Sequence, residues 1–221
     1  MVKIERSFPA PASLAAESEK VSGSYSKPDV IRQLKADFHN KCYICEMKDL
    51  QDPEVEHLLP HKNGKYPERK FDWNNLFWSC GHCNSVKNQE KYDTGILDCC
   101  KKDPEKAIFF RMYEGNICVT AMDSADKRAV LTADLIQEVF NIKNTGMRVC
   151  KSALRLQKLN MEMNILYDNL EEMRRNPESK VVRRKLRALL RRESEFAAFK
   201  RNYVRENQDR FPQLAEYIET L

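Results

Sequence analysis

Apolar residues recur every three or four positions in the segment that follows Pro28. A proline suits the first turn of a helix, because the N–H that it lacks would have no helical partner there. The apolar residues that carry the period are Val30, Ile31, Leu34 and Phe38. The pattern predicts a short helix over residues 28–39.

The same helical period dominates the chain beyond Thr132, whose residue type favours the N-cap position. It predicts a helix at about 133–142, a long helix near 147–175, one or two helices between 178 and 207, and a last turn or two after Pro212. The second half of the chain is therefore predicted to be a helical bundle or hairpin.

Shorter apolar runs in the first half predict β-strands. Residues 55–59 and 75–79 are strand candidates separated by a long polar loop, and residues 83–91 can form a short helix after the second strand. Residues 107–122 predict a hairpin, because Glu114-Gly-Asn116 is a good tight-turn sequence. The predicted fold class is α+β.

The amino-terminal segment has no sustained period. Residues 1–27 carry scattered Ser, Pro and Gly, which predicts an extended arm that packs either on the body of the protein or on a partner. The predicted organisation is thus an arm at 1–27, a core at 28–103, a hairpin at 104–130 and a basic helical region at 131–221.

The composition favours a folded chain without a membrane span. With 221 residues, 42% hydrophobic and 32% charged, the chain can form one sizeable domain or two small ones. Prolines interrupt the apolar patch at 8–16, and no apolar run approaches the length of a spanning helix. We therefore expect neither secretion nor a membrane anchor, and a cytoplasmic location.

The net charge of +5 is modest, but its distribution is uneven. Basic residues greatly outnumber acidic ones between Arg174 and Arg201, which favours a polyanionic partner. The candidate nucleic-acid contacts are Arg183, Arg184, Lys185, Arg187, Arg191 and Arg192. A solvated helix face, or a face that binds an acidic protein surface, explains these residues equally well.

Two CxxC pairs predict a metal site. Cys42 and Cys45 form the first pair and Cys80 and Cys83 the second, and together they can close one tetrahedral zinc site of four thiolates. In a reducing cytosol such pairs hold metal rather than form disulfides. A zinc ion closed by four thiolates has no open position for water, so we expect it to be structural, and its loss to unfold the module.

The remaining cysteines are assigned by their neighbours in sequence. Cys118 and Cys150 stand in apolar surroundings and are expected to be small core residues. For the pair Cys99 and Cys100, a redox or second-metal role stays open. His82, inside the second CxxC pair, is expected to face solvent.

Glu56 and His57 lie between the two CxxC pairs and offer the chemistry of phosphodiester hydrolysis, which needs an activated water and a divalent cation. Neighbours on a strand point to opposite sides, so a carboxylate ligand and an imidazole base reach one site only where the strand ends or twists. Taken alone, a histidine in an apolar run is more often a buried core residue.

With their surroundings, these residues resemble the HNH endonucleases, which have a ββα-metal fold. In that family an acidic residue precedes the first His, an Asn stands in the middle, and a His or Asn follows the last knuckle cysteine. Glu56-His57, Asn75 and Asn84 match these elements in order, and the resemblance covers roughly residues 38–92.

The resemblance implies a role for each matched residue. His57 would be the general base, Glu56 and Asn84 would hold a catalytic Mg²⁺ or Mn²⁺, and Asn75 would brace the loop that aims His57. Lys87 would contact the phosphate. A further candidate for metal or phosphate contact is His61, against a solvated loop histidine. The chain departs from the family in having Glu where Asp is commoner and Asn where the last His stands, which favours hard cations.

Residues 3–9 (KIERSFP) and 57–67 (HLLPHKNGKYP) are also similar to the HNH subunits of bacterial Septu-type antiphage systems, including versions tied to retrons. This resemblance implies an ABC/SMC-like ATPase partner and, in the retron versions, a retron RNA/DNA. The chain has no GxxxxGK[ST] motif, so a nucleotide-driven step must come from another polypeptide. DNA is the favoured substrate and RNA such as tRNA the alternative. The competing hypothesis is that the chain is a non-catalytic zinc-ribbon module that binds nucleic acid or protein.

Overall fold

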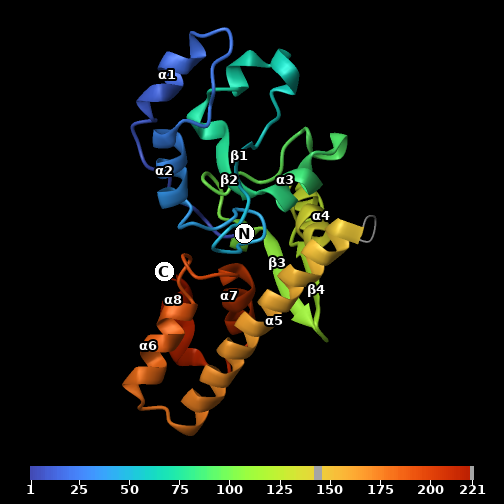
Figure 1. Cartoon of the computed structure of the whole chain (residues 1–221). Coiled ribbons are helices and arrows are strands. Elements are labelled where there is room, and N and C mark those ends of the chain that lie inside the picture. The colour runs from blue at the N-terminus through green and yellow to red at the C-terminus, as the bar shows by residue number, and fades with distance from the viewer. Residues whose placement is uncertain (142–145, 220–221) are drawn as a thin grey trace.

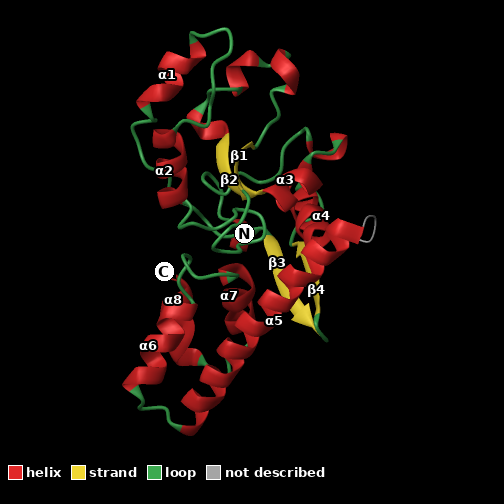
Figure 2. Cartoon of the chain, in the orientation of Figure 1, coloured by secondary structure: helices red, strands yellow, loops and turns green. Residues whose placement is uncertain are grey.

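The computed structural model describes residues 1–141 and 146–219. Within them the chain has the predicted α+β character, with two small antiparallel sheets and helices around them (Figures 1 and 2). The first half of the chain forms the upper part of Figure 1, helices α6 to α8 form the lower part, and α5 runs between the two.

The first sheet and the helix after it carry most of the candidate chemistry. Strand β1 (Pro53–His57) pairs with β2 (Leu76–Cys80), and α3 (Gly81–Lys87) follows at once. The predicted order of strand, long loop, strand and helix is confirmed. The first strand begins and ends two residues earlier than predicted, and α3 is shorter, because the chain leaves the helix at Asn88.

Helix α2 (Pro28–Asp37) forms as predicted and packs on β2. Its residues Val30 and Leu34, with the adjoining Phe38, are fully buried. The rings of Phe38 and Phe77 meet edge to face at 5.6 Å, a geometry that suits the charge distribution of two aromatic rings. Helix and sheet therefore share one core.

The amino-terminal segment packs on the body of the protein, which decides between the two predicted alternatives. Val2 and Ile4 are buried, and the Ile4 amide donates to the Cys99 carbonyl. The Arg6 guanidinium donates to the Trp73 and Leu76 carbonyls. The segment is not wholly extended, because Ala12–Ser18 forms helix α1.

The predicted hairpin is confirmed. Strands β3 (Ile108–Tyr113) and β4 (Asn116–Ala121) are joined by Glu114 and Gly115, whose φ angles are 47° and 76°. Positive φ at both central residues is what a two-residue hairpin turn with the right twist requires. The hairpin contacts helix α4 through β4 and helix α7 through β3.

Helix α4 (Lys127–Asn141) begins earlier than predicted. The Asp126 carboxylate accepts from the Arg128 and Ala129 amides and caps the first turn. The predicted N-cap, Thr132, is therefore wrong: it lies inside the helix, where its hydroxyl donates to the Arg128 carbonyl and accepts from the Leu97 amide. The predicted last residue, 142, lies outside the described residues.

The helices of the second half follow the predicted boundaries closely. They are α5 (Gly146–Arg175), α6 (Lys180–Leu189), α7 (Ala197–Glu206) and α8 (Ala215–Glu219), with a 3₁₀ turn at Pro212–Leu214. Helices α6 and α7 both contact α5. The predicted helical bundle is thus confirmed, although the division of the chain into domains stays a prediction.

A buried carboxylate joins the hairpin to the last helices. Glu105 stands just before β3, and its side chain accepts from Arg192, Arg201 and Arg205. Arg201 is fully buried and also donates to the Leu190 and Ile218 carbonyls. A buried charge is tolerated when it is paired and hydrogen-bonded in this way.

The assignment of Cys118 and Cys150 to the core is wrong, because both are exposed. In β4, Ile117 and Val119 face the core, so the strand alternation turns Cys118 outward. Cys150 lies on the outer side of α5. None of the helices in the described part of the chain has both the length and the apolar character needed to cross a membrane.

Candidate functional site

The four knuckle cysteines form a compact buried cluster. The Sγ atoms of Cys42, Cys45, Cys80 and Cys83 all lie within 4.8 Å of one another. Tetrahedral zinc, with Zn–S bonds of about 2.3 Å, needs sulfur atoms about 3.8 Å apart, so the cluster fits a metal such as zinc. It joins the loop after α2 to the start of α3.

Helix α5 supplies a cation to this cluster. Arg155 is buried, and its Nη2 donates to the Cys80 Sγ at 3.0 Å. Hydrogen bonds from the other three cysteines, together with the Arg155 charge, lower the pKa of Cys80, whereas burial raises the pKa of the Cys45 and Cys83 thiols. A bound metal would offset that burial cost, since thiolates are the form that binds metal.

His82 does not face solvent, and this prediction is wrong. Its side chain is 2% exposed, and its Nε2 lies 3.0 Å from the Val139 carbonyl and near the Ser152 hydroxyl. The reason is that α3 packs against α4, and the side of α3 that carries His82 faces that contact. His82 therefore helps to join three helices.

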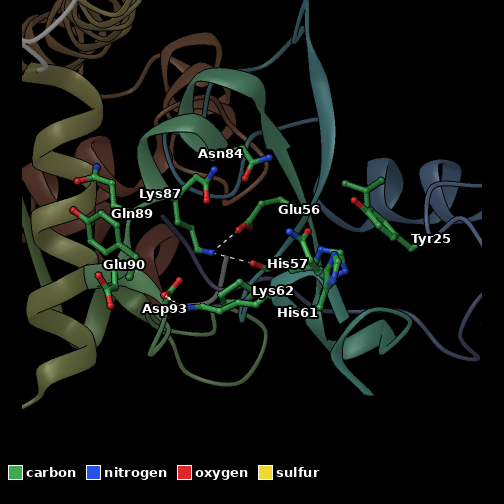
Figure 3. Close-up of a pocket in the computed structure, with 15 residues that line it drawn as sticks. Tyr25, Glu56, His57, His61, Lys62, Asn84, Lys87, Gln89, Glu90 and Asp93 are labelled. Atoms are coloured by element: carbon green, nitrogen blue, oxygen red, sulfur yellow. Dashed lines mark hydrogen bonds and ion pairs between the residues drawn. The ribbon is translucent and has the colours of Figure 1, made fainter. Parts of the chain in front are cut away.

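Beside the cluster lies an open cavity of about 620 Å³ (Figure 3). Glu56 and His57 reach it from the end of β1, Asn84 and Lys87 from successive turns of α3, and His61 from the loop after β1. Because β1 ends at His57, the chain turns there, and neighbouring side chains reach one cavity. The structure thus brings these five candidate residues together.

His57 has the protonation state that a base needs. Burial lowers its pKa to about 4, so the ring is neutral at neutral pH. Its Nε2 lies 3.0 Å from the Lys70 carbonyl, which can only accept, so Nε2 carries the proton. Nδ1 then keeps its lone pair, and no hydrogen bond to it is found within the described residues. The Tyr25 ring packs edge to face against the His57 ring, with the two ring centroids 4.5 Å apart.

Glu56 is 4% exposed and held on both oxygens. Its Oε2 accepts from the Tyr43 hydroxyl at 2.6 Å, and its Oε1 pairs with the Lys87 ammonium at 2.5 Å. Lys87 also donates to the His57 carbonyl at 2.9 Å (Figure 3). The positive charge of Lys87 therefore lies against the carboxylate rather than at the mouth of the cavity.

Asn84 lines the same cavity, and its amide is oriented by a second glutamate. The Asn84 Nδ2 donates to the Glu54 Oε2 at 2.5 Å, which leaves the Asn84 Oδ1 as an available acceptor. Carboxylate and amide oxygens are ligands that Mg²⁺ and Mn²⁺ accept. Glu56 and Asn84 therefore carry oxygen atoms of the type that such a cation binds, and a cation on the Glu56 Oε1 would replace its contact with Lys87.

Asn75 is buried and contacts only backbone. Its Oδ1 accepts from the Leu59 amide at 2.8 Å, and its Nδ2 donates to the Leu59 carbonyl at 2.9 Å and the Arg69 carbonyl at 3.0 Å. Lys70, whose carbonyl faces His57, is the next residue. One amide therefore holds together both ends of the loop that carries His61.

Other candidates occupy separate places. The His61 Nδ1 is buried without a hydrogen-bond partner among the described residues, and its ring lies 4.9 Å from that of His57. Cys99 is buried and Cys100 half-buried, with the Cys100 Sγ 3.5 Å from Arg6. Cys99 and Cys100 are not part of the four-cysteine cluster. Within residues 1–141 and 146–219, that cluster is the group of side chains found close enough together to bind a metal ion.

The basic residues of the second half do not line the cavity. Helix α6 lies at the opposite end of the molecule from β1 and α3 (Figure 1). Five of the six candidates are exposed, namely Arg183, Arg184, Lys185, Arg187 and Arg191. Arg192 is half-buried and ion-paired with Asp103 and Glu105, so its guanidinium is already engaged.

No family model matches the chain. The chain is 30% identical over 110 residues to a curated protein named Septu protein PtuB, from Bacillus thuringiensis. It is distantly similar to a Septu protein. The match spans 48% of this chain and 40% of the PtuB sequence, so it covers less than half of either protein.

Several residues of the site were missed from the sequence. Glu54 orients Asn84, and the strand period of two places it on the same face as Glu56, so that signal was available. Tyr43 lies inside the first CxxC pair, and nothing in its neighbourhood marks it as the donor to Glu56. Tyr25 comes from the amino-terminal segment, which has no period to place it.

Proposed function

We propose that this chain is a metal-dependent endonuclease of the HNH type that acts in antiphage defence. The observation that carries the proposal is the convergence of Glu56, His57 and Asn84 on one open cavity, with His57 neutral and its Nδ1 free. The similarity to Septu protein PtuB supports the defence role. The order of β1, β2 and α3 around the cysteine cluster supports the ββα-metal fold.

In this proposal His57 takes a proton from the attacking water at Nδ1. The Lys70 carbonyl keeps the other ring nitrogen protonated and fixes the plane of the ring. The imidazolium that forms is stabilised by that same carbonyl, and a neutral base held in place contributes typically 10²–10⁴-fold to a rate, as an order of magnitude. Asn75 keeps the loop, and with it the Lys70 carbonyl, in position.

Glu56 and Asn84 would hold the catalytic Mg²⁺ or Mn²⁺. When bound, such a cation supplies charge stabilisation to the phosphate and the leaving oxygen. Glu54 would keep the Asn84 amide turned so that its oxygen faces the cavity. Lys87 would contact the phosphate, and His61 would make a further contact from the facing loop.

Zinc bound by the four cysteines would be structural, since all four thiolates are used and buried. The exposed basic residues of α6 would bind the nucleic-acid backbone away from the cleavage site. An ABC/SMC-like ATPase would be the partner subunit, with a retron RNA/DNA in retron-linked systems. DNA is the favoured substrate, and RNA such as tRNA the alternative.

The test is cleavage of plasmid DNA and of total cellular RNA, side by side, with Mg²⁺ or Mn²⁺, with and without the neighbouring ATPase. We expect wild type to cut one polymer and His57→Ala to cut neither. His39→Ala is the matched control, because His39 lies half-exposed on another loop and should keep full activity. Zinc content and circular dichroism report whether each variant is folded.

A His57→Ala variant that still cuts would contradict the assigned base. If folded, zinc-loaded wild type cut neither polymer under any of these conditions, the chain would be a non-catalytic module that binds nucleic acid or protein.

A further inference from the structure

Helix α5 exposes a second apolar stripe opposite the one that it buries. Its buried side includes Leu159, Leu166 and Leu170. On the outer side, four large apolar residues are exposed, to 74%, 53%, 59% and 43%: Met147, Leu154, Met161 and Ile165. The exposed Cys150 joins them. A large apolar patch left open to water marks an interaction surface more often than chance exposure.

The spacing of these residues is that of a helix-pairing seam. Met147, Leu154 and Met161 follow one another at intervals of seven, and Ile165 comes four residues later. At about 100° per residue the five residues fall within an arc of about 60°, along about 27 Å of helix. A seam that repeats every seven residues is the pattern that packs against another long helix.

We infer that α5 pairs with α5 of a second copy of this chain, in antiparallel orientation. Charge decides the direction. Lys151 and Lys158 lie beside the stripe between Met147 and Met161, whereas Asp168 and Glu172 follow on the same side of α5 after Ile165. Within the chain, Lys151 pairs with Asp52 at 3.5 Å and Lys158 with Glu195 at 3.4 Å. Both lysine side chains remain at least 40% exposed, so they can also reach a second copy.

Antiparallel pairing centred between Leu159 and Asn160 places Leu154 of one copy opposite Ile165 of the other. In the same register Lys151 lies opposite Asp168. Two-fold symmetry repeats each contact, so Lys151 of each copy meets Asp168 of the other. Parallel pairing would instead place lysine beside lysine and Cys150 beside Cys150.

The antiparallel arrangement also affects substrate binding. This effect rests on the proposed function, whereas the dimer itself does not. The first turns of α5 contact the cavity side of the molecule, since Arg148 donates to the Ser85 hydroxyl at 2.6 Å, next to Asn84. The last turn of α5 leads to Arg174, Arg175 and α6. Each copy therefore brings its basic surface to the side of the other copy that holds the cavity.

The test is the mass of the full-length chain by size-exclusion chromatography with light scattering at several concentrations. We expect twice the 25.9 kDa of one chain. Replacing Leu154 and Met161 together by Glu should raise the dissociation constant at least about 100-fold, because two charges per copy would be buried unpaired. Val181→Glu is the matched control: Val181 is also 53% exposed but lies on α6.

Direction is tested separately. Lys151→Glu should weaken the dimer, and adding Asp168→Lys should restore it. In a background without the exposed Cys118 and Cys150, the pair of changes Leu154→Cys and Ile165→Cys should give a cross-linked dimer on mild oxidation. Cross-linking of wild type through Cys150 would overturn the antiparallel direction.

A wild-type chain that stays monomeric at tens of micromolar would overturn the proposal, as would a dimer that the Glu variants leave intact. Neither outcome depends on cleavage, so the dimer and the nuclease fail independently.

Discussion

At the scale of single residues, Glu56 and His57 are neighbours with opposite electrostatic surroundings. Glu56 is buried and accepts hydrogen bonds from the Lys87 ammonium and the Tyr43 hydroxyl. Burial lowers the pKa of His57, although its hydrogen bond to the Lys70 carbonyl acts in the opposite direction. One peptide unit thus separates an ion-paired carboxyl group from a neutral imidazole, and the proposed function uses the first as a metal ligand and the second as the base.

The lowered pKa of His57 predicts the acid limb of the pH–rate profile. Because burial lowers the pKa to about 4, the base stays unprotonated as pH falls from neutral to about 5, and the rate should fall only as pH approaches 4. Single-turnover cleavage over this range, with folding checked at each pH, measures the midpoint. A midpoint near the ordinary histidine value of about 6.5 would contradict the buried environment.

Asn75 predicts a stability effect without reference to cleavage. Asn75→Ala removes three hydrogen bonds and leaves half-buried backbone groups of Leu59 and Arg69 unpaired, which should lower the free energy of unfolding by about 2–3 kcal/mol. Asn74→Ala is the control, because Asn74 is exposed and its side chain contacts only Asp72. Urea unfolding measures both, and equal losses would contradict the bracing role.

At the scale of elements, the helices and strands that were predicted correctly are those whose boundaries are set by residues close together in the sequence. The hairpin and α5 match their predicted ranges, because a tight-turn sequence and a sustained helical period are local signals. The start of α4 was missed because the capping residue is Asp126, ahead of the apolar period. The burial of His82 could not be predicted, because it depends on how α3 packs against α4 and α5.

For the candidate site, too, the residues could be named from the sequence, but the contacts between them could not. Glu56, His57, Asn75 and Asn84 were assigned through the resemblance to the HNH endonucleases, and they lie beside the cavity or in its supporting loop. The phosphate contact expected of Lys87 stays a prediction, and its pairing with Glu56 depends on the distance between β1 and α3, which spacing along the chain does not reveal.

The contact between α5 and the cysteine cluster makes a prediction for metal binding. Arg155→Leu should weaken zinc binding about 10- to 100-fold, because it removes the buried cation that donates to Cys80. Competition with a chromophoric chelator measures the affinity. Arg148→Leu is the control: Arg148 lies on the same helix but contacts Ser85 at the surface. Equal zinc affinities for the two variants would contradict the role of Arg155.

At the scale of the whole molecule, the separation of α6 from the cavity predicts that nucleic-acid affinity and cleavage respond to different changes. Replacing Arg184 and Lys185 by Ala should reduce the steepness of the salt dependence by about 2, at roughly 0.9 per phosphate contact on duplex DNA. Arg192→Ala should leave the slope unchanged and lower stability, because Arg192 is paired with Asp103 and Glu105.

Binding to a short duplex at several salt concentrations separates these effects, and a His57→Ala background, which we expect not to cut, keeps the duplex intact. If Arg192→Ala changed the slope as much as the double variant, the basic surface would be wrongly assigned.

The position of the hairpin between α4 and α7 affects how the chain folds during its synthesis on the ribosome. All four knuckle cysteines and the whole candidate site lie within the first 141 residues, so a ribosome releases them early. The face of β3 that packs on α7, where the Phe110 and Phe199 rings lie 5.4 Å apart, has no cover until the last helices emerge. During synthesis, therefore, the apolar face of β3 leaves the ribosome after the four cysteines and stays uncovered until α7 has emerged.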